Sequence, residues 1–345
     1  MLASLLTALA ADGCRVELCF LKRPGAVGEE LLANGLPATV CDLRDTRSPA
    51  ALLALLRLLR KRQPDLLYIQ DHHDCLFWGR LAAGLCGFLP ALSPVHSSAQ
   101  GRLRAFRLPN RLLLGLSPHL ATLGQWQERA LAEREGLARG DWTAIPNPVP
   151  GLAAFTAAAA APPRAAAGRR ELVCVAALRP EKRLQRLLDV LALLQRRRSL
   201  RLTLIGEGPE RARLEAHAAA LGLGDCLRLL GRRDDVAALL PDFDLFLLGS
   251  EEEALPLSVL EALISGLPVA APPHGALPGL LGAGRGLLLA GEAPAAWAEA
   301  IDGYLDALPP LPARRAYGRR LAEEHAPERF AARYGRLLAR LGGQG

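Results

Sequence analysis

Two patterns of hydrophobic and polar residues alternate along this chain. Short runs of apolar and β-branched residues are followed by longer leucine-rich stretches, in which apolar residues recur at helical spacing. This succession is typical of βαβ units, in which helices connect parallel strands. It predicts an α/β protein built from doubly wound parallel sheets.

The pattern also gives the approximate position of each element. In the first half it predicts strands near 15–21, 38–42, 65–70 and 91–96, with helices near 2–11, 49–62, 75–86 and 119–136. In the second half it predicts strands near 171–178, 201–205, 226–230, 244–248, 267–271 and 286–289, with helices near 183–197, 209–221, 234–240, 256–265, 293–306 and within 312–342.

A chain of 345 residues fits two domains. Residues 151–170 form an alanine- and proline-rich stretch without a periodic apolar face, which indicates a loop or linker. We therefore expect an N-terminal domain over 1–150, a C-terminal domain over 171–311, and closing helices over 312–345.

The beginning of the chain departs from the doubly wound pattern. Such a domain normally starts with a central strand and a glycine-rich turn, yet this sequence opens inside a helix and reaches its first strand at Arg15. The first strand is therefore predicted to be missing. Since a gap in a sheet leaves backbone groups unpaired, we favour a sequence truncated at its start over a domain that lacks this strand.

Composition narrows the class of protein. Half of the residues are hydrophobic and 22% are charged, as in globular proteins, and no apolar run is long enough to predict a membrane-spanning helix. The start has no basic region and no cleavage site of a signal peptide. The seven cysteines are dispersed without a Cys-x-x-Cys pair, which indicates reduced thiols and a cytoplasmic protein.

The net charge of +7 is compatible with nucleic acid, an anionic membrane surface or a solvated face. Aromatic residues make up only 5% of the chain, which disfavours nucleic-acid binding. The segment 48–63 has leucines at helical spacing and a basic end. We expect the leucines to face the core. The basic end comprises Arg57, Arg60, Lys61 and Arg62, and we expect it to contact anionic membrane weakly.

The segment 250–271, SEEEALPLSVLEALISGLPVAA, is the strongest candidate for chemistry. It follows an apolar strand and predicts a helix that begins near Pro256, whose free N–H groups favour an anion. Glu253 precedes this helix and Glu261 lies about two turns inside it. Two carboxylates so placed suit the two ends of a nucleotide sugar, although glutamates at a helix start are often only solvated.

This segment resembles the signature of glycosyltransferase family 4, S-x-x-E-G-x-P-x-x-x-x-E-A-x-x-x-G-x-P-V-x-A. Ala254 stands where the signature has glycine. The matching residues are Ser250, Glu253, Pro256, Glu261, Ala262, Gly266, Pro268, Val269 and Ala271.

The resemblance implies a role for each polar group. Glu253 would contact hydroxyls of the donor sugar, and Glu261 would contact the ribose hydroxyls. The diphosphate would lie against the intervening segment, at Leu255, Leu257 and Ser258.

The segment VAALRPEKRL (175–184) resembles the family's G-R-L-x-x-E-K-G element, whose Arg and Lys bind the donor diphosphate. Lys182 matches, and it is one of only three lysines beside 39 arginines, which favours a specific need for its ammonium group. Ala177 occupies the Arg position, so Arg179 or Arg183 is expected to substitute.

Two further segments resemble donor-binding elements. LIGEGPERARLE (204–215) is similar to G-x-G-P-x-x-x-x-L-E, with Gly206 and Gly208 allowing close backbone approach, whereas Arg211 replaces the third glycine of a dinucleotide motif. The segment 228–247 implies a loop beside the nucleobase, lined by Leu230, Gly231 and Arg232.

Histidines end two predicted strands of the first half, where parallel strands face a ligand. By resemblance His96 is the family's strand-end histidine and is our candidate for a catalytic contact with donor or acceptor. His72 and His73 are second choices. Strand-end histidines are, however, more often ordinary polar residues, and no spacing in the sequence matches a metal site or a hydrolase.

The resemblance implies a GT-B fold, with two Rossmann-like domains facing a cleft and the donor bound by the C-terminal one. It implies retaining transfer from a UDP- or GDP-type sugar to a glycan, lipid-linked or small hydroxyl acceptor, without a metal cofactor. Glu253, Lys182 and His96 would be catalytic. The alternatives are a donor-binding protein without turnover, in view of Ala177 and Ala254, and a sugar-nucleotide epimerase of the same fold.

Overall fold

The computed structural model describes residues 5–6, 9–10, 13–46, 48–70, 73–95, 119–135, 140–162 and 168–343. The chain forms two compact units, each described by itself below. Unit 1 comprises residues 1–148 and 327–345, and unit 2 comprises residues 149–326.

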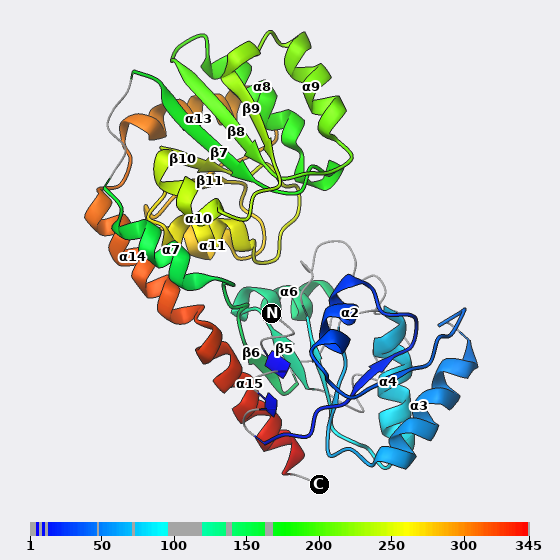
Figure 1. Cartoon of the computed structure of the whole chain (residues 1–345). Helices are drawn as coiled ribbons and strands as arrows, with labels where there is room; N and C mark the ends of the chain where they lie inside the picture. The colour runs from blue at the N-terminus through cyan, green and yellow to red at the C-terminus, as the bar shows by residue number, and fades with distance from the viewer. Residues whose placement is uncertain are drawn as a thin grey trace. The chain divides into compact units, whose positions relative to one another are not determined.

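Unit 2 contains a sheet of six parallel strands in the order β12-β11-β10-β7-β8-β9 (Figure 1). The first strand, β7, lies in the middle, because the chain adds strands on one side of it and then on the other. This is the doubly wound order expected from the sequence. The strands are β7 (Arg170–Val175), β8 (Leu200–Ile205), β9 (Leu227–Gly231), β10 (Leu245–Leu247), β11 (Val269–Ala271) and β12 (Leu287–Leu288).

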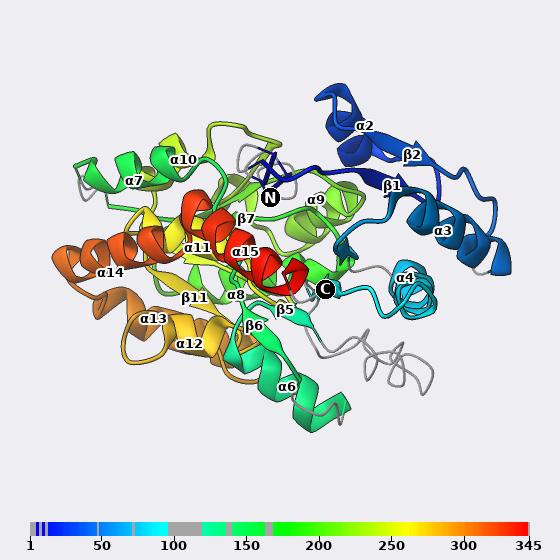
Figure 2. The same cartoon turned by 90° about the horizontal axis from the view of Figure 1, so that it is seen from below.

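Helices cover both faces of this sheet. α11 and α14 lie side by side in both views of the ribbon, with α7 packed against them (Figures 1 and 2). α8, α9 and α13 contribute to the core of the other face. The helices are α7 (Leu152–Ala160), α8 (Leu184–Leu194), α9 (Arg211–Ala220), α10 (Val236–Leu239), α11 (Leu257–Ile264), α12 (Leu277–Leu281), α13 (Pro294–Asp306) and α14 (Leu311–Glu324).

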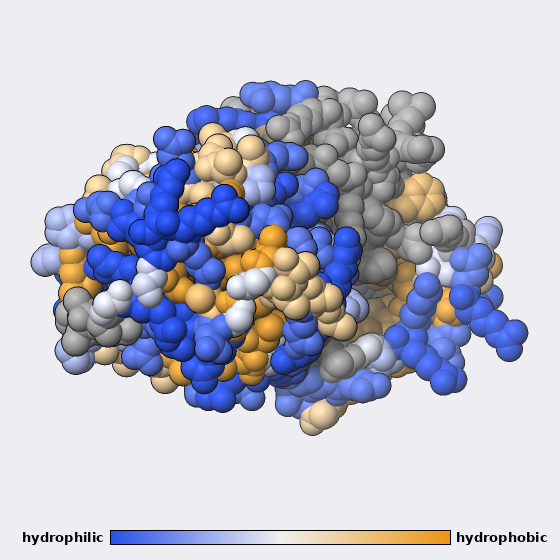
Figure 3. All heavy atoms as spheres, turned by 90° about the horizontal axis from the view of Figure 1, so that it is seen from above, coloured by the Kyte–Doolittle hydropathy of each residue, from blue (hydrophilic) through white to orange (hydrophobic). Residues whose placement is uncertain are grey.

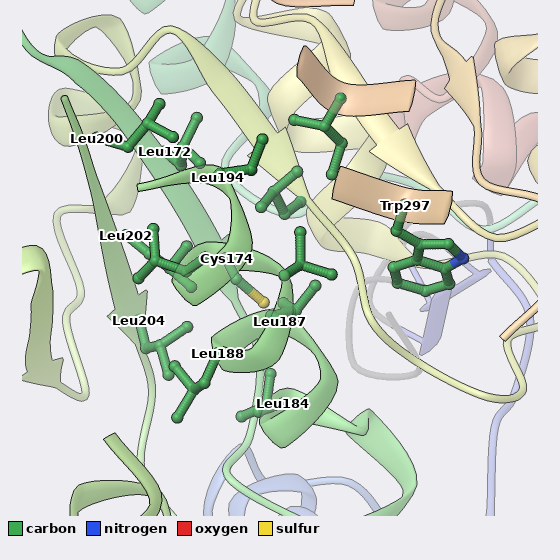
Figure 4. Close-up of a cluster of buried hydrophobic side chains, with 14 of the residues drawn as sticks. Leu172, Cys174, Leu184, Leu187, Leu188, Leu194, Leu200, Leu202, Leu204 and Trp297 are labelled. Atoms are coloured by element: carbon green, nitrogen blue, oxygen red, sulfur yellow. The ribbon is translucent and has the colours of Figure 1, made fainter. Parts of the chain in front are cut away.

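The core of unit 2 is built largely from leucine. α8 repeats leucine at the spacing of one helix face, so that Leu184, Leu187, Leu188, Leu191 and Leu194 are all buried. These side chains pack against alternate residues of β7 and β8 and against the indole of α13 (Figure 4). Burial of this apolar stripe is the main force that holds α8, and the loop before it, on the sheet.

The described strands of unit 1 form two sheets, of two and of four parallel strands. No described strand joins β1 to β3, although β7 fills the corresponding central place in unit 2. The strands are β1 (Leu18–Phe20) and β2 (Ala38–Val40), then β3 (Leu67–Tyr68), β4 (Ala91–Pro94), β5 (Leu120–Thr122) and β6 (Trp142–Ala144).

The helices of unit 1 include the last one of the chain. The apolar face of α15, with Phe330, Tyr334 and Leu337, packs with Leu92 and Ile145 of the four-stranded part. The segment 312–342 is therefore helical as predicted, but it forms two helices that belong to different units. The helices whose bounds the structure describes in unit 1 are α2 (Ala26–Ala33), α3 (Pro49–Arg62), α4 (His73–Leu85), α6 (Gln125–Glu135) and α15 (Pro327–Gly342).

Two expectations about elements were wrong. The helix expected over 119–136 is the strand β5 followed by α6, because Gly124 separates a buried Leu-Ala-Thr run from the helix. The expected linker 151–170 begins with α7, which Phe155 anchors as its one buried described side chain. α2, β6 and α12 were not predicted.

Hydrophilic residues dominate the face of the molecule shown in Figure 3, and hydrophobic residues appear there in smaller groups. Within the described residues, no helix has the length and apolar character required to cross a bilayer.

The leucine core gives a direct test of the fold of unit 2. Leu187→Ala should lower the free energy of unfolding by about 2–5 kcal/mol, because the side chain is fully buried and its removal leaves a cavity. Leu193→Ala, at a partly buried position of the same helix, should have a smaller effect. Chemical denaturation followed by circular dichroism measures both, and equal losses would contradict this description of the core.

Candidate active site

The strand order of unit 2 brings two loops together. β7 and β10 are neighbours, so the loops that follow their carboxyl ends meet at the point where the order of the sheet reverses. Open α/β sheets bind ligands at such a point. The first loop includes the 3-10 turn Pro180–Lys182, and the second runs from the end of β10 to the start of α11.

These loops place Lys182 against Glu253. The Lys182 Nζ donates to Glu253 Oε1 at 2.6 Å, with side-chain exposures of 24% and 13%. The two residues are 71 positions apart, so this contact depends on the fold and not on local sequence. Cys174, in β7, is close enough to interact electrostatically with both Lys182 and Glu253. Burial raises the pKa of its thiol to about 12 and keeps it protonated.

A second ion pair joins the same loops. Arg183 donates to Glu251 Oε2 from Nε at 2.8 Å and from Nη2 at 2.6 Å, and the Glu251 N–H donates to the Glu181 carbonyl at 3.2 Å. Arg183 has a left-handed backbone, with φ 46° and ψ 39°, at the position where the family element has glycine. Sequence reasoning named Arg183 but missed Glu251, since nothing in its local pattern marks a partner.

Glu261 lies inside α11, half-buried. Burial raises the pKa of its carboxyl above the usual value of 4.5. No side chain in the described part of the chain forms a hydrogen bond with this carboxylate that would offset the loss of water. A half-buried acid without such a partner suits the hydroxyls of a ligand.

The backbone around Glu253 is held by a loop that the sequence did not single out. Ala254 is outside the left-handed region, so the replacement of glycine there causes no strain. Gly275 has a φ of 53°, and a Cβ on it would lie 2.1 Å from the Glu253 carbonyl oxygen. The Ala276 N–H donates to the Ala254 carbonyl at 2.9 Å. Glycine at 275 therefore permits the close backbone contact that holds the segment of Glu253 and Ala254 in place.

The glycines after β8 serve close contacts within the protein. A Cβ on Gly206 would lie 2.0 Å from the Ala176 carbonyl oxygen, and one on Gly208 would lie 2.3 Å from that of Leu178. Gly206 donates its N–H to the carbonyl of Gly231, which has a φ of 72°. The close approach that these glycines allow is thus to the backbone of the loop after β7.

The other predicted donor contacts are distributed around the same edge of the sheet. Leu230 is half-buried and Arg232 exposed at the end of β9, and Leu255 is buried just before α11. The first turn of α11 holds two further predicted contacts, Leu257 and Ser258, both half-buried.

Arg179 is exposed and, with Arg183, lines a cavity of about 230 Å³ beside the first loop. Neither Lys182 nor Glu253 lines this cavity. Arg179 and Arg183 were both expected to replace the family's arginine at the position of Ala177. Of the two, Arg183 contacts the second loop and Arg179 does not.

The histidines expected in unit 1 lie outside what the structure describes. β4 ends at Pro94, two residues before His96, and His96 and His72 are both outside the described residues. His73 begins α4, but its side chain is not described. Their predicted roles stay predictions.

Comparison of the fold with solved structures identifies its class. HepE of Anabaena, solved with UDP, aligns over 98% of this chain and 96% of its own, with a TM-score of 0.78 at 18% identity. Sucrose-phosphate synthase from Thermosynechococcus elongatus aligns over 99% and 92%, with a TM-score of 0.72 at 19% identity. The two parallel α/β units thus have the GT-B fold, as expected from the sequence.

The sequence matches two family models, one for each half. The model described as Glycosyltransferase Family 4 matches residues 1–150, and the model described as Glycosyl transferases group 1 matches residues 158–320. The chain belongs to the family 4 glycosyltransferases.

Curated relatives match parts of the chain. 2-Deoxystreptamine glucosyltransferase of Streptomyces kanamyceticus is 34% identical over 151 residues, 41% of this chain and 39% of that protein. GDP-mannose-dependent alpha-(1-6)-phosphatidylinositol dimannoside mannosyltransferase of Mycobacterium tuberculosis is 36% identical over 172 residues, 50% and 43% of the two. The chain thus spans less than half the length of these relatives.

The close approach at Gly206 predicts a strong substitution effect. Gly206→Ala should destabilise unit 2 by at least about 2 kcal/mol, because the new Cβ collides with a backbone carbonyl and φ is 144°. Gly303→Ala, in α13 with no atom within 4 Å of the new Cβ, should be neutral or stabilising by about 0.4–1 kcal/mol. Denaturant unfolding of both variants checks this, and a neutral Gly206→Ala would refute it.

Proposed function

We propose that this chain transfers a sugar from a nucleotide-diphosphate donor to a hydroxyl acceptor, with retention of the anomeric configuration. The observation that carries the proposal is the Lys182–Glu253 pair at the switch point of unit 2, in a chain of the family 4 glycosyltransferases.

Lys182 and Glu253 are suited to give up their contact with each other and to contact a nucleotide-sugar donor instead. Without ligand, the ammonium and the carboxylate neutralise each other in a site that is only partly open to water. A diphosphate carries more negative charge than one carboxylate, so it attracts Lys182 and frees Glu253 for hydroxyls of the donor sugar. The ammonium then stabilises the charge that develops on the departing nucleotide.

Glu261 completes the donor site in this proposal. Its half-buried carboxylate accepts hydrogen bonds from the ribose hydroxyls, which replace the water lost on burial. Arg183 supplies the positive charge that Ala177 does not, and the free N–H groups at the start of α11 add a partial positive charge. These groups allow transfer without a metal ion.

Similar proteins indicate which nucleotide bases and acceptors to test first. The relatives named above include a GDP-mannose-dependent phosphatidylinositol dimannoside mannosyltransferase and a 2-deoxystreptamine glucosyltransferase, and a solved structure of the same fold contains UDP. UDP- and GDP-sugars are therefore the first donors to test. The seven described cysteines are all free, which supports a reducing, cytoplasmic location.

The activity is tested by incubating the protein with UDP- and GDP-sugars, with and without lipid-linked and small acceptors, in the presence of a chelator. We expect nucleotide release that depends on an acceptor, and NMR of the product should show the anomeric configuration of the donor. An inverted product would contradict retention, release of free sugar epimer would indicate an epimerase, and binding without release would indicate a protein without turnover.

The two glutamates should differ in their kinetic effects. Glu253→Gln should lower kcat by roughly ten- to hundredfold, and Glu261→Gln should raise the KM for the donor by a similar factor, since each loses hydrogen bonds that involve a charge. Glu299→Gln, an exposed site on α13, is the control. Steady-state kinetics decide, and wild-type values in both site variants would refute the assignment.

Glu261→Gln should also change stability with pH. Because the folded protein raises the pKa of this carboxyl, ionisation destabilises the fold as pH rises above 4.5. The variant should therefore have a higher Tm than wild type at pH 7, and this difference should vanish below pH 4.5. Scanning calorimetry across this range measures it, and a Tm at pH 7 below that of wild type would show that the carboxylate stabilises the fold.

A further inference from the structure

Among the residues that the structure describes, four large hydrophobic side chains are exposed, and all four belong to unit 1. Three of them lie on the neighbouring helices α3 and α4 or directly after them. Leu53 is 52% exposed, Leu85 is 55% exposed and Phe88 is 67% exposed.

The two helices run in the same direction and end at the same edge of unit 1. The Trp78 indole N–H donates to the Thr46 carbonyl at 2.7 Å, which joins the first half of α4 to the residues before α3. α3 leads into β3 and α4 leads into β4, and these strands pair in parallel with Leu67 opposite Ala91. The helices lie side by side in Figures 1 and 2.

The turn after α4 turns the Phe88 ring outward. Gly87 and Phe88 both have left-handed backbones, with φ values of 87° and 60°. The Leu89 N–H donates to the Ala83 carbonyl at 3.1 Å, and Leu89 packs against the core. A left-handed backbone is unfavourable for a bulky residue, and the fold gains little burial in return, since Phe88 stays 67% exposed.

Basic side chains accompany these exposed hydrophobic ones. Arg57, Arg60 and Lys61 are exposed in the second half of α3. No acidic side chain in the described ranges forms an ion pair with any of the three, whereas Arg62 pairs with Glu17 at 3.0 Å. The core-facing side of the same helix is filled by Leu55 and Leu59, so the basic groups have no role in the core.

We propose that this surface, formed by Leu53, Arg57, Arg60, Lys61, Leu85 and Phe88 and here called the α3–α4 surface, docks on an anionic lipid bilayer. Phe88 and Leu85 enter the interface between headgroups and acyl chains, and the three cations contact lipid phosphates. The proposal does not depend on the donor site, which lies in unit 2.

The chemistry of this surface favours a bilayer over a second copy of the chain. Three partly exposed side chains present roughly 300 Å² of apolar surface, well below the roughly 800 Å² per partner of a stable dimer. Two copies would also bring like charges together. A bilayer accepts few inserted side chains and supplies the negative charge that the three cations lack.

α15 provides a matched comparison within the same unit. Arg329, Arg336 and Arg340 are three exposed basic residues on this helix, and none of its large apolar residues is exposed, since four are buried and Leu338 is partly buried. Charge alone would make α15 as good a contact as α3. Of these two helical surfaces in the described part of unit 1, the α3–α4 surface is the one that combines the charges with exposed hydrophobic side chains.

The test is sedimentation of the full chain with vesicles of phosphatidylcholine, alone or mixed with phosphatidylglycerol, at about 0.1 M and about 1 M salt. Wild type should bind the anionic vesicles at low salt only. The triple variant Arg57→Gln, Arg60→Gln, Lys61→Gln should bind roughly 100-fold more weakly, at about fivefold per residue. The matched variant Arg329→Gln, Arg336→Gln, Arg340→Gln should stay within about threefold of wild type.

A second variant separates docking from folding. Phe88→Asn should weaken vesicle binding about tenfold and keep or raise the Tm, because asparagine tolerates a left-handed backbone. Val40→Asn, at the fourth exposed hydrophobic position, is the control and should bind as wild type does. Wild-type binding by Phe88→Asn, equal losses in the two triple variants, no binding to either vesicle, or a dimer that Phe88→Asn dissociates would each overturn the proposal.

Discussion

The adjacency of β7 and β10 decides where the polar side chains of unit 2 can meet. Parallel strands send their following loops to the same edge, and a reversal of the strand order leaves a place where two such loops face each other without a helix between them. The leucine face of α8 fixes the first loop and the buried face of α11 fixes the second. Lys182 and Glu253 are thereby presented to each other on supports that are well packed.

Contacts around this pair limit its movement. Arg183 and Glu251 join the two loops a second time, and Gly206, Gly208 and Gly275 let neighbouring backbone approach more closely than any side chain would permit. An isolated surface ion pair contributes little to stability. Here the supporting contacts already restrict the two side chains, so pairing costs them less conformational entropy. The site is therefore preorganised for a ligand whose more highly charged anion replaces the Glu253 carboxylate beside Lys182.

Sequence reasoning found the elements with a clear period and the residues with a family pattern. α3 was predicted at its observed bounds because its leucines recur on one face, and Lys182 and Glu253 were named from separate motifs. β5 was missed because three residues are too few to show alternation, and α7 because its alanine-rich sequence has no apolar face. Contacts such as Gly275 with Glu253 join distant segments, and no local pattern marks them.

A crystal structure of the chain with bound UDP or GDP would show whether the Lys182–Glu253 pair separates to admit a diphosphate. We expect the diphosphate to contact the Lys182 ammonium, the 2.6 Å contact between Lys182 and Glu253 to be broken, and the ribose hydroxyls to lie against Glu261. A nucleotide bound away from both loops, or bound with the ion pair intact, would contradict it.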